Sequence, residues 1–245
     1  MEKVLLFISG INIKIKKILF ILSFSTLFLS SNILGANPSI RFKHINTGGG
    51  SVLSILNDRT GFLWFGTFLG LVRYDGYDFK VFNSASNYPT SLSDNSVKVM
   101  IEDTQGNIWI GTEDGLNFFN TKTETFTVYR HQSNNPKSLS HNSVTSIIED
   151  KQGHFWVGTN GGGLNYFNPK TQEFTHYRHQ ENDSNSLSSD IVFSIVEDQK
   201  GILWIGTYGR GLNSLNPLTG EFIYYQEKDG LPNDVIYQII EDDEG

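Results

Sequence analysis

The stretch IIEDKQGHFWVGT, which spans Ile147–Thr159, recurs along the chain. Close copies begin at Ile101 (IEDTQGNIWIGT) and at Val196 (VEDQKGILWIGT), and a looser copy, LNDRTGFLWFGT, begins at Leu56. The tryptophans at the centre of these copies follow one another at intervals of 45, 47 and 48 residues: Trp64, Trp109, Trp156 and Trp204. A repeat period of this length, combined with strand-like content, is typical of propeller blades.

Each repeat reads as four short strands joined by tight turns. Val97, Val99 and Ile101 alternate with their neighbours at period two, as residues of a β-strand do. An Asp-x-x-Gly turn follows, then the tryptophan strand, a third strand such as GLNYFN, and a last strand such as EFTHYRH. Four-stranded antiparallel sheets repeated radially form a β-propeller, so we predict an all-β fold of this architecture.

The phase of the repeat predicts an incomplete propeller over residues 37–245. Residues 40–46 match the last strand of a blade, and residues 234–245 match the first strand of a fifth blade. Four full blades are expected in between, over residues 51–83, 95–130, 142–179 and 190–226. A ring of six to eight blades needs roughly 280 to 370 residues, so we expect this chain to be the first part of a longer protein. A closed ring of four blades is the alternative.

The first 36 residues have the features of a secretory signal peptide. Lys14, Lys16 and Lys17 precede an apolar run over residues 18–34, and Ala36 ends a short segment of small residues. We therefore expect cleavage after about Ala36 and export of the remainder. An uncleaved membrane anchor is the alternative, although the apolar run is short for a span of about 20 residues.

The composition of the exported part narrows the classes of partner. Without residues 1–36, 15 basic residues face 25 acidic ones, a net charge of −10 that disfavours nucleic acid and anionic membranes. The chain has no cysteine, which excludes disulfides, thiol nucleophiles and thiolate metal sites. The histidines show no zinc-ligand spacing and no phosphate-binding loop is present, so we predict neither a metal nor a cofactor.

The repeated ED-x-x-G-x-x-W-x-GT…GLN-x-x-N pattern, with connectors such as YRHQSNNPKSLSHNSV, resembles two-component regulator propeller repeats. The resemblance covers nearly all of the chain after about Ile40. It implies the periplasmic sensor region of a hybrid two-component sensor, whose parent is anchored in the inner membrane. In that family two propellers usually precede an immunoglobulin-like sandwich, a membrane helix and a histidine kinase, and the sensors commonly detect oligosaccharides released from polysaccharides. The chain itself carries no kinase, so the resemblance implies a binding role for it, with the rest of the sensor and a homodimer partner as further contacts.

Residues that recur in every repeat are expected to be structural. A side chain that serves one functional centre would not be copied at equivalent places around a ring, so the four tryptophans should pack between blades. The adjacent acids of each repeat, such as Glu149 and Asp150, lie on a strand where neighbours point to opposite faces, which makes them a poor catalytic pair. The glycines of the Gly-Thr motif are also predicted to be structural: Gly66, Gly111, Gly158 and Gly206.

Function is expected where the repeats differ. In a propeller the loops between the second and third strands and the connectors between blades emerge on one face, around the central channel. Amides, carboxylates and an arginine on that face can bind sugar hydroxyls or a uronate carboxylate, and aromatic rings can stack on sugars. The predicted ligand-binding residues are Phe68, Glu113, Asp114, His141, Asn142, Asn160, Tyr208 and Arg210. The alternative is that these side chains are solvated loop tips.

The sequence leaves three hypotheses about function. The first is a non-catalytic propeller that binds oligosaccharides. The second is a secreted propeller lyase or glycan-degrading enzyme, for which His141 with Glu113 is the pair to test, although no nucleophile elbow such as G-x-S-x-G is present. The third is a protein-interaction propeller.

Overall fold

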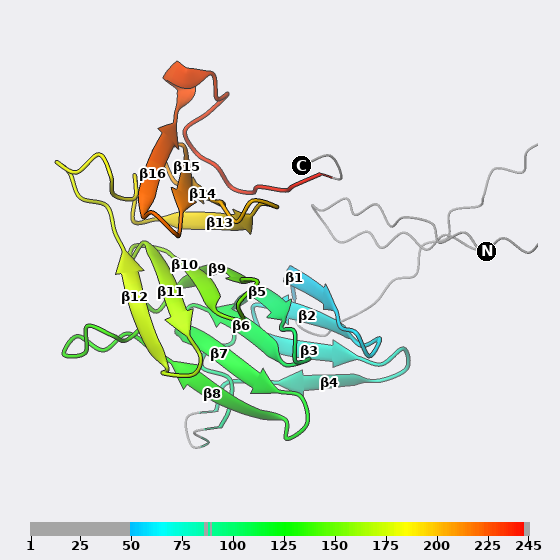
Figure 1. Cartoon of the computed structure of the whole chain (residues 1–245). Helices are drawn as coiled ribbons and strands as arrows, with labels where there is room; N and C mark the ends of the chain where they lie inside the picture. Colours follow the sequence, from blue (N-terminus) through cyan, green and yellow to red (C-terminus); the bar gives the residue numbers. More distant parts are fainter. Residues whose placement is uncertain (1–49, 86–87, 89, 243–245) are drawn as a thin grey trace, which may run out of the picture. The chain divides into compact units, whose positions relative to one another are not determined.

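The computed structural model describes residues 50–85, 88 and 90–242, and the strands in them form four sheets (Figure 1). The predicted signal peptide and the strand expected over residues 40–46 lie outside this range. The strands of the first two blades are β1 (Val52–Asn57), β2 (Leu63–Thr67), β3 (Gly70–Tyr74), β4 (Phe79–Phe82), β5 (Val97–Glu102), β6 (Ile108–Thr112), β7 (Gly115–Asn120) and β8 (Thr125–Tyr129). Those of the next two are β9 (Val144–Glu149), β10 (Phe155–Thr159), β11 (Leu164–Asn168), β12 (Glu173–Tyr177), β13 (Val192–Glu197), β14 (Leu203–Thr207), β15 (Leu212–Asn216) and β16 (Glu221–Tyr225).

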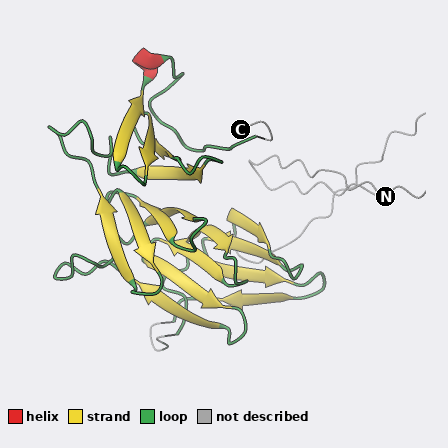
Figure 2. Ribbon diagram, viewed as in Figure 1, coloured by secondary structure: helices red, strands yellow, loops and turns green. Residues whose placement is uncertain are grey.

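Each sheet is one blade whose strands follow chain order, and all neighbours are antiparallel. The first strand is innermost, because β1 contacts β5, β5 contacts β9, and β9 contacts β13. Strands account for nearly all the regular structure of the described residues, and a single turn of 3₁₀ helix follows β16 (Figure 2). The all-β propeller architecture predicted from the repeat is confirmed. Within this part of the chain no helix is long and apolar enough to cross a membrane.

The Asp-x-x-Gly segment closes the first hairpin of each blade, and in the first, second and fourth blades its aspartate also accepts the indole N–H of the tryptophan. In the second blade Asp103 Oδ1 accepts the backbone N–H groups of Gln105 and Asn107, at 2.9 and 2.8 Å. Asp103 Oδ2 accepts the indole N–H of Trp109 at 3.1 Å, and Asp103 as a whole is 4% exposed. Gly106 ends the turn with a φ of +84°, a conformation that glycine adopts without steric cost. The acidic residue of the motif therefore satisfies turn and indole donors that would otherwise be buried unpaired.

Three hydrophobic clusters lie between successive blades rather than within one blade. Trp64 packs with Phe119 of the next blade, at a ring distance of 5.5 Å, and Trp109 packs with Phe155 at 4.2 Å. Trp156 joins the cluster that contains Ile195 and Phe222 of the fourth blade. Each of these three tryptophans is at most 3% exposed, so the apolar area that stabilises the fold is buried mainly at blade interfaces.

Glycine in the second strand lets the next blade approach closely. A Cβ atom built on Gly158 would lie 2.6 Å from Cγ1 of Val192, which belongs to β13 of the next blade. The same contact relates Gly66 to Val97 and Gly111 to Val144. These distances are far below van der Waals contact, so any larger residue would push the inner strands apart.

A β-bulge interrupts every inner strand. The ladder skips one residue between β1 and β2, β5 and β6, β9 and β10, and β13 and β14. Because of the extra residue, Val97 and Met100 belong to the cluster with the first blade, while Val99 and Ile101 pack toward the third. The strict alternation expected for Val97, Val99 and Ile101 is therefore wrong.

The connectors between blades are part of the core. Leu139 of the second connector is fully buried between the second and third blades, as Leu92 and Leu187 are at the other two interfaces. Each connector then covers the outer strand of the blade that follows it. The backbone N–H of Phe126 donates to the carbonyl of Thr90 (3.1 Å), that of Phe174 to the carbonyl of Lys137 (2.9 Å), and that of Phe222 to Oδ1 of Asn185 (2.8 Å).

The segment after β16 differs from the prediction. No strand is formed over the described residues 234–242, where the first strand of a fifth blade is expected. The segment nevertheless follows the inner-strand path at its start, because the N–H of Ile236 donates to the carbonyl of Thr207 (3.0 Å) and its side chain faces Gly206. A β-strand forms only with a neighbouring strand that shares its ladder of hydrogen bonds. The described residues after β16 provide no such neighbouring strand. Trp204 is consequently only partly buried and lines a pocket of about 490 Å³ with Ile239.

Candidate functional site

The loops between second and third strands lie against the ends of the connectors in every blade. The N–H groups of Gly70, Gly115, Gly163 and Gly211 donate to the carbonyls of Asn95, Asn142, Asp190 and Asp234 at 2.8–2.9 Å. The two sets of segments therefore form one surface, which we call the loop face. The loop face comprises residues 68–69, 113–114, 160–162 and 208–210 of the loops and residues 94–95, 141–142, 189–190 and 233–234 of the connectors.

Two of the predicted ligand-binding residues hold this face together. Nδ2 of Asn142 donates to Oδ1 of Asp114 (2.9 Å), and Nε of Arg130 pairs with Oδ2 of the same carboxylate (2.9 Å). The backbone N–H of His131 donates to Oδ1 of Asn142 (2.7 Å). Because their polar atoms are engaged within the protein, the geometry favours a structural role for Asp114 and Asn142.

Glu113 belongs to a charged cluster at the interface of the second and third blades. Its carboxylate pairs with the ammonium of Lys98 at 2.5 Å, and Lys98 also donates to Oγ of Ser143 of the next connector (2.9 Å). Burial alone would raise the pKa of Glu113, but hydrogen bonds from Lys98 and Ser143 and the charges of Lys98 and His141 outweigh it, and the pKa is lowered. Nδ1 of His141 accepts the backbone N–H of Ser143 at 3.2 Å.

The histidine–glutamate pair considered for an enzyme lies in this cluster. A general acid at neutral pH requires a raised pKa, whereas the pKa of Glu113 is lowered and its carboxylate is tied to an ammonium. Nδ1 of His141 is also occupied by a backbone donor. The arrangement suits an ionised hydrogen-bond acceptor better than a proton donor.

Tyr208 belongs to an aromatic cluster at the fourth blade. Its ring meets that of Phe193 edge-on at 5.8 Å, and Phe193 stacks on Tyr237 at 5.1 Å with 14° between the ring planes. Tyr208 is 51% exposed and Tyr237 is 70% exposed, so both rings present a free surface to solvent. Exposed aromatic faces of this kind bind apolar or ring-shaped ligands.

The other predicted residues occupy separate places. Phe68 is 55% exposed in the first loop. Asn160 donates through its backbone to the carbonyl of Ser143 (2.9 Å), and its side chain is exposed.

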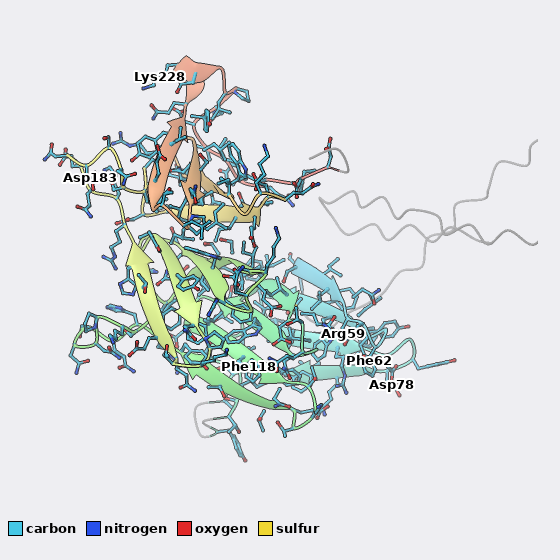
Figure 3. All side chains as sticks on the ribbon, viewed as in Figure 1. Arg59, Phe62, Asp78, Phe118, Asp183 and Lys228 are labelled. Atoms are coloured by element: carbon cyan, nitrogen blue, oxygen red, sulfur yellow. The ribbon has the colours of Figure 1, made fainter. Side chains whose placement is uncertain are left out.

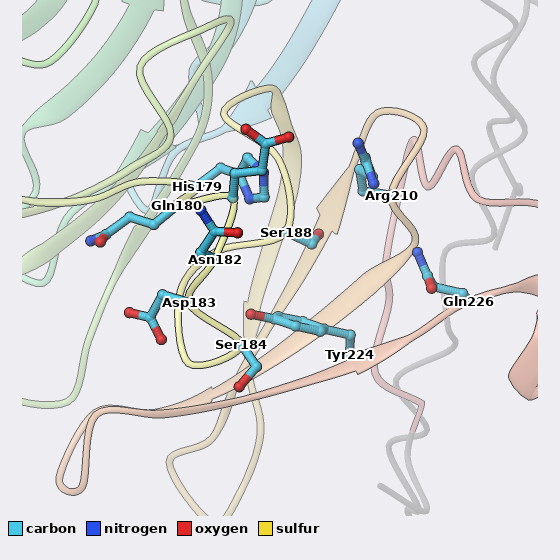
Figure 4. A pocket seen from close by; sticks show the side chains of 10 residues that line it. His179, Gln180, Asn182, Asp183, Ser184, Ser188, Arg210, Tyr224 and Gln226 are labelled. Atoms are coloured by element: carbon cyan, nitrogen blue, oxygen red, sulfur yellow. The ribbon is translucent and has the colours of Figure 1, made fainter.

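Arg210 points into a different hollow from the one expected. It lines a pocket of about 370 Å³ between the connector that precedes the fourth blade and the outer strands of that blade. Figure 4 shows Arg210 and Gln226 on one side of this pocket and Asn182 and Asp183 on the other, with the ring of Tyr224 among them. Among the described residues Arg210 has no hydrogen-bonding or ionic partner, which leaves its guanidinium available. Asp183 lies in the connector between β12 and β13 (Figure 3).

The sequence pattern does not predict Lys98, Phe193 and Tyr237 as site residues, because all three lie in segments expected to be regular strand. Their signal is nevertheless present in the repeat. When the inner strands are superposed on one another, the residue after the first Val or Ile differs in every copy. The described part of the chain contains no group of three or more histidines and carboxylates arranged to hold a metal ion.

The four antiparallel sheets define a β-propeller, and comparison with known families identifies the repeats that build it. The profile described as two component regulator propeller matches residues 48–68, 91–114, 138–161 and 186–209. Each match runs from the inner strand, or from the connector that precedes it, to the loop after the tryptophan strand. These four matches identify the repeats of the chain as two-component regulator propeller repeats. No curated protein sequence matches the chain.

Solved structures with the same fold include extracellular domains of bacterial regulators. One is that of the putative hybrid two component system BT3049 from B. thetaiotaomicron, with a TM-score of 0.67 and 30% identity over 75% of this chain and 26% of that one. Another is that of the putative one component system BT4673 from the same organism, with a TM-score of 0.68 and 24% identity over 81% and 28%. The chain thus spans about a quarter of the length of these structures.

A catalytically inactive virginiamycin B lyase from Staphylococcus aureus also shares the fold, with a TM-score of 0.53. Its identity is 13%, over 74% of this chain and 57% of the lyase. At this identity the likeness concerns the fold alone.

Proposed function

We propose that the chain is a ligand-sensing propeller from the periplasmic part of a hybrid two-component sensor, and that its loop face binds oligosaccharides released from polysaccharides. The observation that carries the proposal is the pairing of exposed aromatic rings with an ionised acceptor on one face. Tyr208 and Tyr237 offer surfaces for a sugar ring, and Glu113 offers a carboxylate for hydroxyl groups. The family and the extracellular relatives support the sensor role.

Signalling requires the ligand to bind two states of the protein with different affinity. The clusters beside the loop face suit this requirement because they reach beyond one blade: Lys98 reaches Ser143 of the next connector, and Phe193 reaches Tyr237 of the segment after β16. A ligand bound across such contacts favours one packing of the blades. In the proposed parent, this bias passes to the remaining sensor domains, to a homodimer partner and through the inner membrane.

Calorimetry with a panel of neutral and acidic oligosaccharides tests the proposal. We expect Tyr208→Ala to weaken binding about 3- to 10-fold, as the loss of one aromatic contact of about 0.5–1.5 kcal/mol does. The matched control is Tyr77→Ala, since Tyr77 is 91% exposed in the turn between β3 and β4. Equal losses for both variants, or an absence of binding across the panel, would count against the proposal. Release of a product from the bound saccharide would replace the binding-only role with an enzymatic one.

A second binding test concerns Arg210 and acidic sugars. Its unpartnered guanidinium can form a charge-assisted pair with a uronate carboxylate, worth about 1.5–3 kcal/mol, or roughly 10- to 100-fold in affinity. We expect Arg210→Ala to lose this factor for acidic members only, with Lys228→Ala, an exposed residue beyond β16 (Figure 3), as the control. An unchanged affinity for acidic members removes Arg210 and its pocket from the site.

A further inference from the structure

We propose that the bulged residue of each inner strand determines which saccharide the loop face accepts. These bulge positions are Leu53, Lys98, Thr145 and Phe193. The proposal rests on the proposed function, and it moves the expected specificity from the loop tips to a row of strand residues beneath them.

The backbone sets the bulge positions apart from their neighbours. The residue before the bulge is valine in all four blades, and in the last three it packs against a glycine of the preceding blade. That valine is held in place by the close approach of the blades. The bulged residue has no opposite residue in the ladder, so its side chain is released from the packing that constrains the rest of the strand. All four bulged side chains are partly exposed.

Contacts link the last three bulged side chains to the segments that follow their own inner strands. Lys98 pairs with Glu113, which lies in the β6–β7 loop of the same blade. It also donates to Ser143, which directly precedes the next inner strand, β9. The hydroxyl of Thr145 donates to the carbonyl of Val192, the residue before the next bulge. The ring of Phe193 contacts that of Tyr208, which lies in the β14–β15 loop of the same blade, and stacks on the ring of Tyr237. The last three bulged side chains thus each contact the segment that lies next along the chain of blades.

Tyr237 extends the row. Ile236 occupies the place of the packed valine, because it lies against Gly206 as Val192 lies against Gly158. Tyr237 therefore stands where a fifth bulged residue would be. The row reads Leu, Lys, Thr, Phe, Tyr, so within the inner strands this position holds a different residue in every copy, while the residue before it is always valine or isoleucine.

The order of side chains along the row indicates the shape of the ligand. Its Phe193–Tyr237 end is aromatic and suits the apolar face of a sugar ring. Toward its other end, next to Leu53, Lys98 and the loop residue Glu113 supply an ammonium and an ionised carboxylate, which bind hydroxyl groups as donor and acceptor. An oligosaccharide with one ring on the aromatic end and hydroxyls on the charged end matches both.

The absence of cysteine from the chain permits a test of the geometry that needs no ligand. In the full chain, Thr145→Cys combined with Phe193→Cys is labelled with pyrene maleimide. We expect excimer fluorescence from this pair, because adjacent inner strands are in contact. Thr175→Cys combined with Ile223→Cys places the labels at equivalent exposed positions of the outer strands β12 and β16, and should give monomer emission only. Excimer emission that is absent from the first pair, or equal in both, overturns the row.

Specificity is tested by changing one bulge at a time against the oligosaccharide panel. We expect Phe193→Ala and Leu53→Lys to change the affinities of panel members unequally, by about 3-fold or more, and so to alter their rank order. The controls Thr175→Ala and Ile223→Lys should preserve it. If the wild type binds and both bulge variants keep every affinity within about twofold, the inference fails while the proposed function stands. If the wild type binds no member, the proposed function and the specificity role fail together, and the excimer result then decides only the geometry of the row.

Discussion

Replacement of Gly158 by alanine tests whether neighbouring blades pack so closely that this position has no room for a Cβ atom. The new methyl would lie 2.2 Å from Oγ of Ser146 and 2.6 Å from Cγ1 of Val192. The serine hydroxyl can rotate away, but Val192 is fully buried in β13. The inner strand of the fourth blade must therefore shift, together with the cluster around it.

Overpacking of this kind costs about 1–3 kcal/mol. For a folded unit of roughly 200 residues, each kcal/mol lowers the melting temperature by about 2–4 °C, so we expect a fall of about 2–12 °C. Gly206→Ala is the matched control, because it occupies the same place in β14 but faces Ile236, which lies in a segment without a strand. That segment can retreat, so Gly206→Ala should lower the melting temperature less.

Thermal unfolding followed by circular dichroism measures both variants. A double-mutant cycle with Val192→Ala then identifies the clash. We expect the double variant to be more stable than the sum of the single losses predicts, by about 1 kcal/mol or more. Equal melting temperatures for Gly158→Ala and the wild type, or a coupling of zero, would refute close blade approach as the reason for glycine.

Two further predictions concern the acidic turn residues. Asp103→Asn keeps an acceptor for the turn amides but presents an amide to the indole of Trp109, so we expect a loss of about 1–3 kcal/mol in urea unfolding, with Glu221→Gln as a neutral control. Burial alone would raise the pKa of Asp58, but hydrogen bonds from Trp64 and from the turn outweigh burial and lower it. The pKa of Asp198 is lowered in the same way, by hydrogen bonds from Trp204 and from its own turn. Since the folded pKa lies below the unfolded value of about 3.9, the stability that these groups contribute is present above pH 4 and is lost as the pH falls through their folded values. Melting temperatures should therefore be steady from pH 7 to about 5 and fall below 4; a fall that begins above pH 5 would contradict this assignment.

The packing between blades was accessible from sequence because it repeats. A tryptophan at intervals of 45 to 48 residues signals equivalent environments, and three of the four tryptophans lie at blade interfaces. The bulges were not accessible for the opposite reason. An inner strand packs on both faces, so an inserted residue is not revealed by a change of face within one strand, and the variable position becomes visible only when the copies are aligned.

The loop face was predicted in outline but not in detail. Equivalence of loops places Glu113, Tyr208 and Arg210 in similar positions, yet their side chains enter a charged cluster, an aromatic cluster and a separate pocket. The direction of a side chain depends on local dihedral angles and on partners from the next blade, and neither can be derived from spacing. The buried leucine of each connector, such as Leu139, was missed because the polar residues around it suggest a solvated loop.

The connectors also bear on the order in which the blades form. Each connector is synthesised before the blade whose outer strand it covers, since Thr90 precedes Phe126 and Lys137 precedes Phe174. An open sheet edge is a template for aggregation, and domains fold progressively as the chain leaves the ribosome. In this protein the connector that covers an outer strand has already left the ribosome when that strand emerges. Growth from the amino terminus therefore covers the outer strands of the second, third and fourth blades as each of them forms.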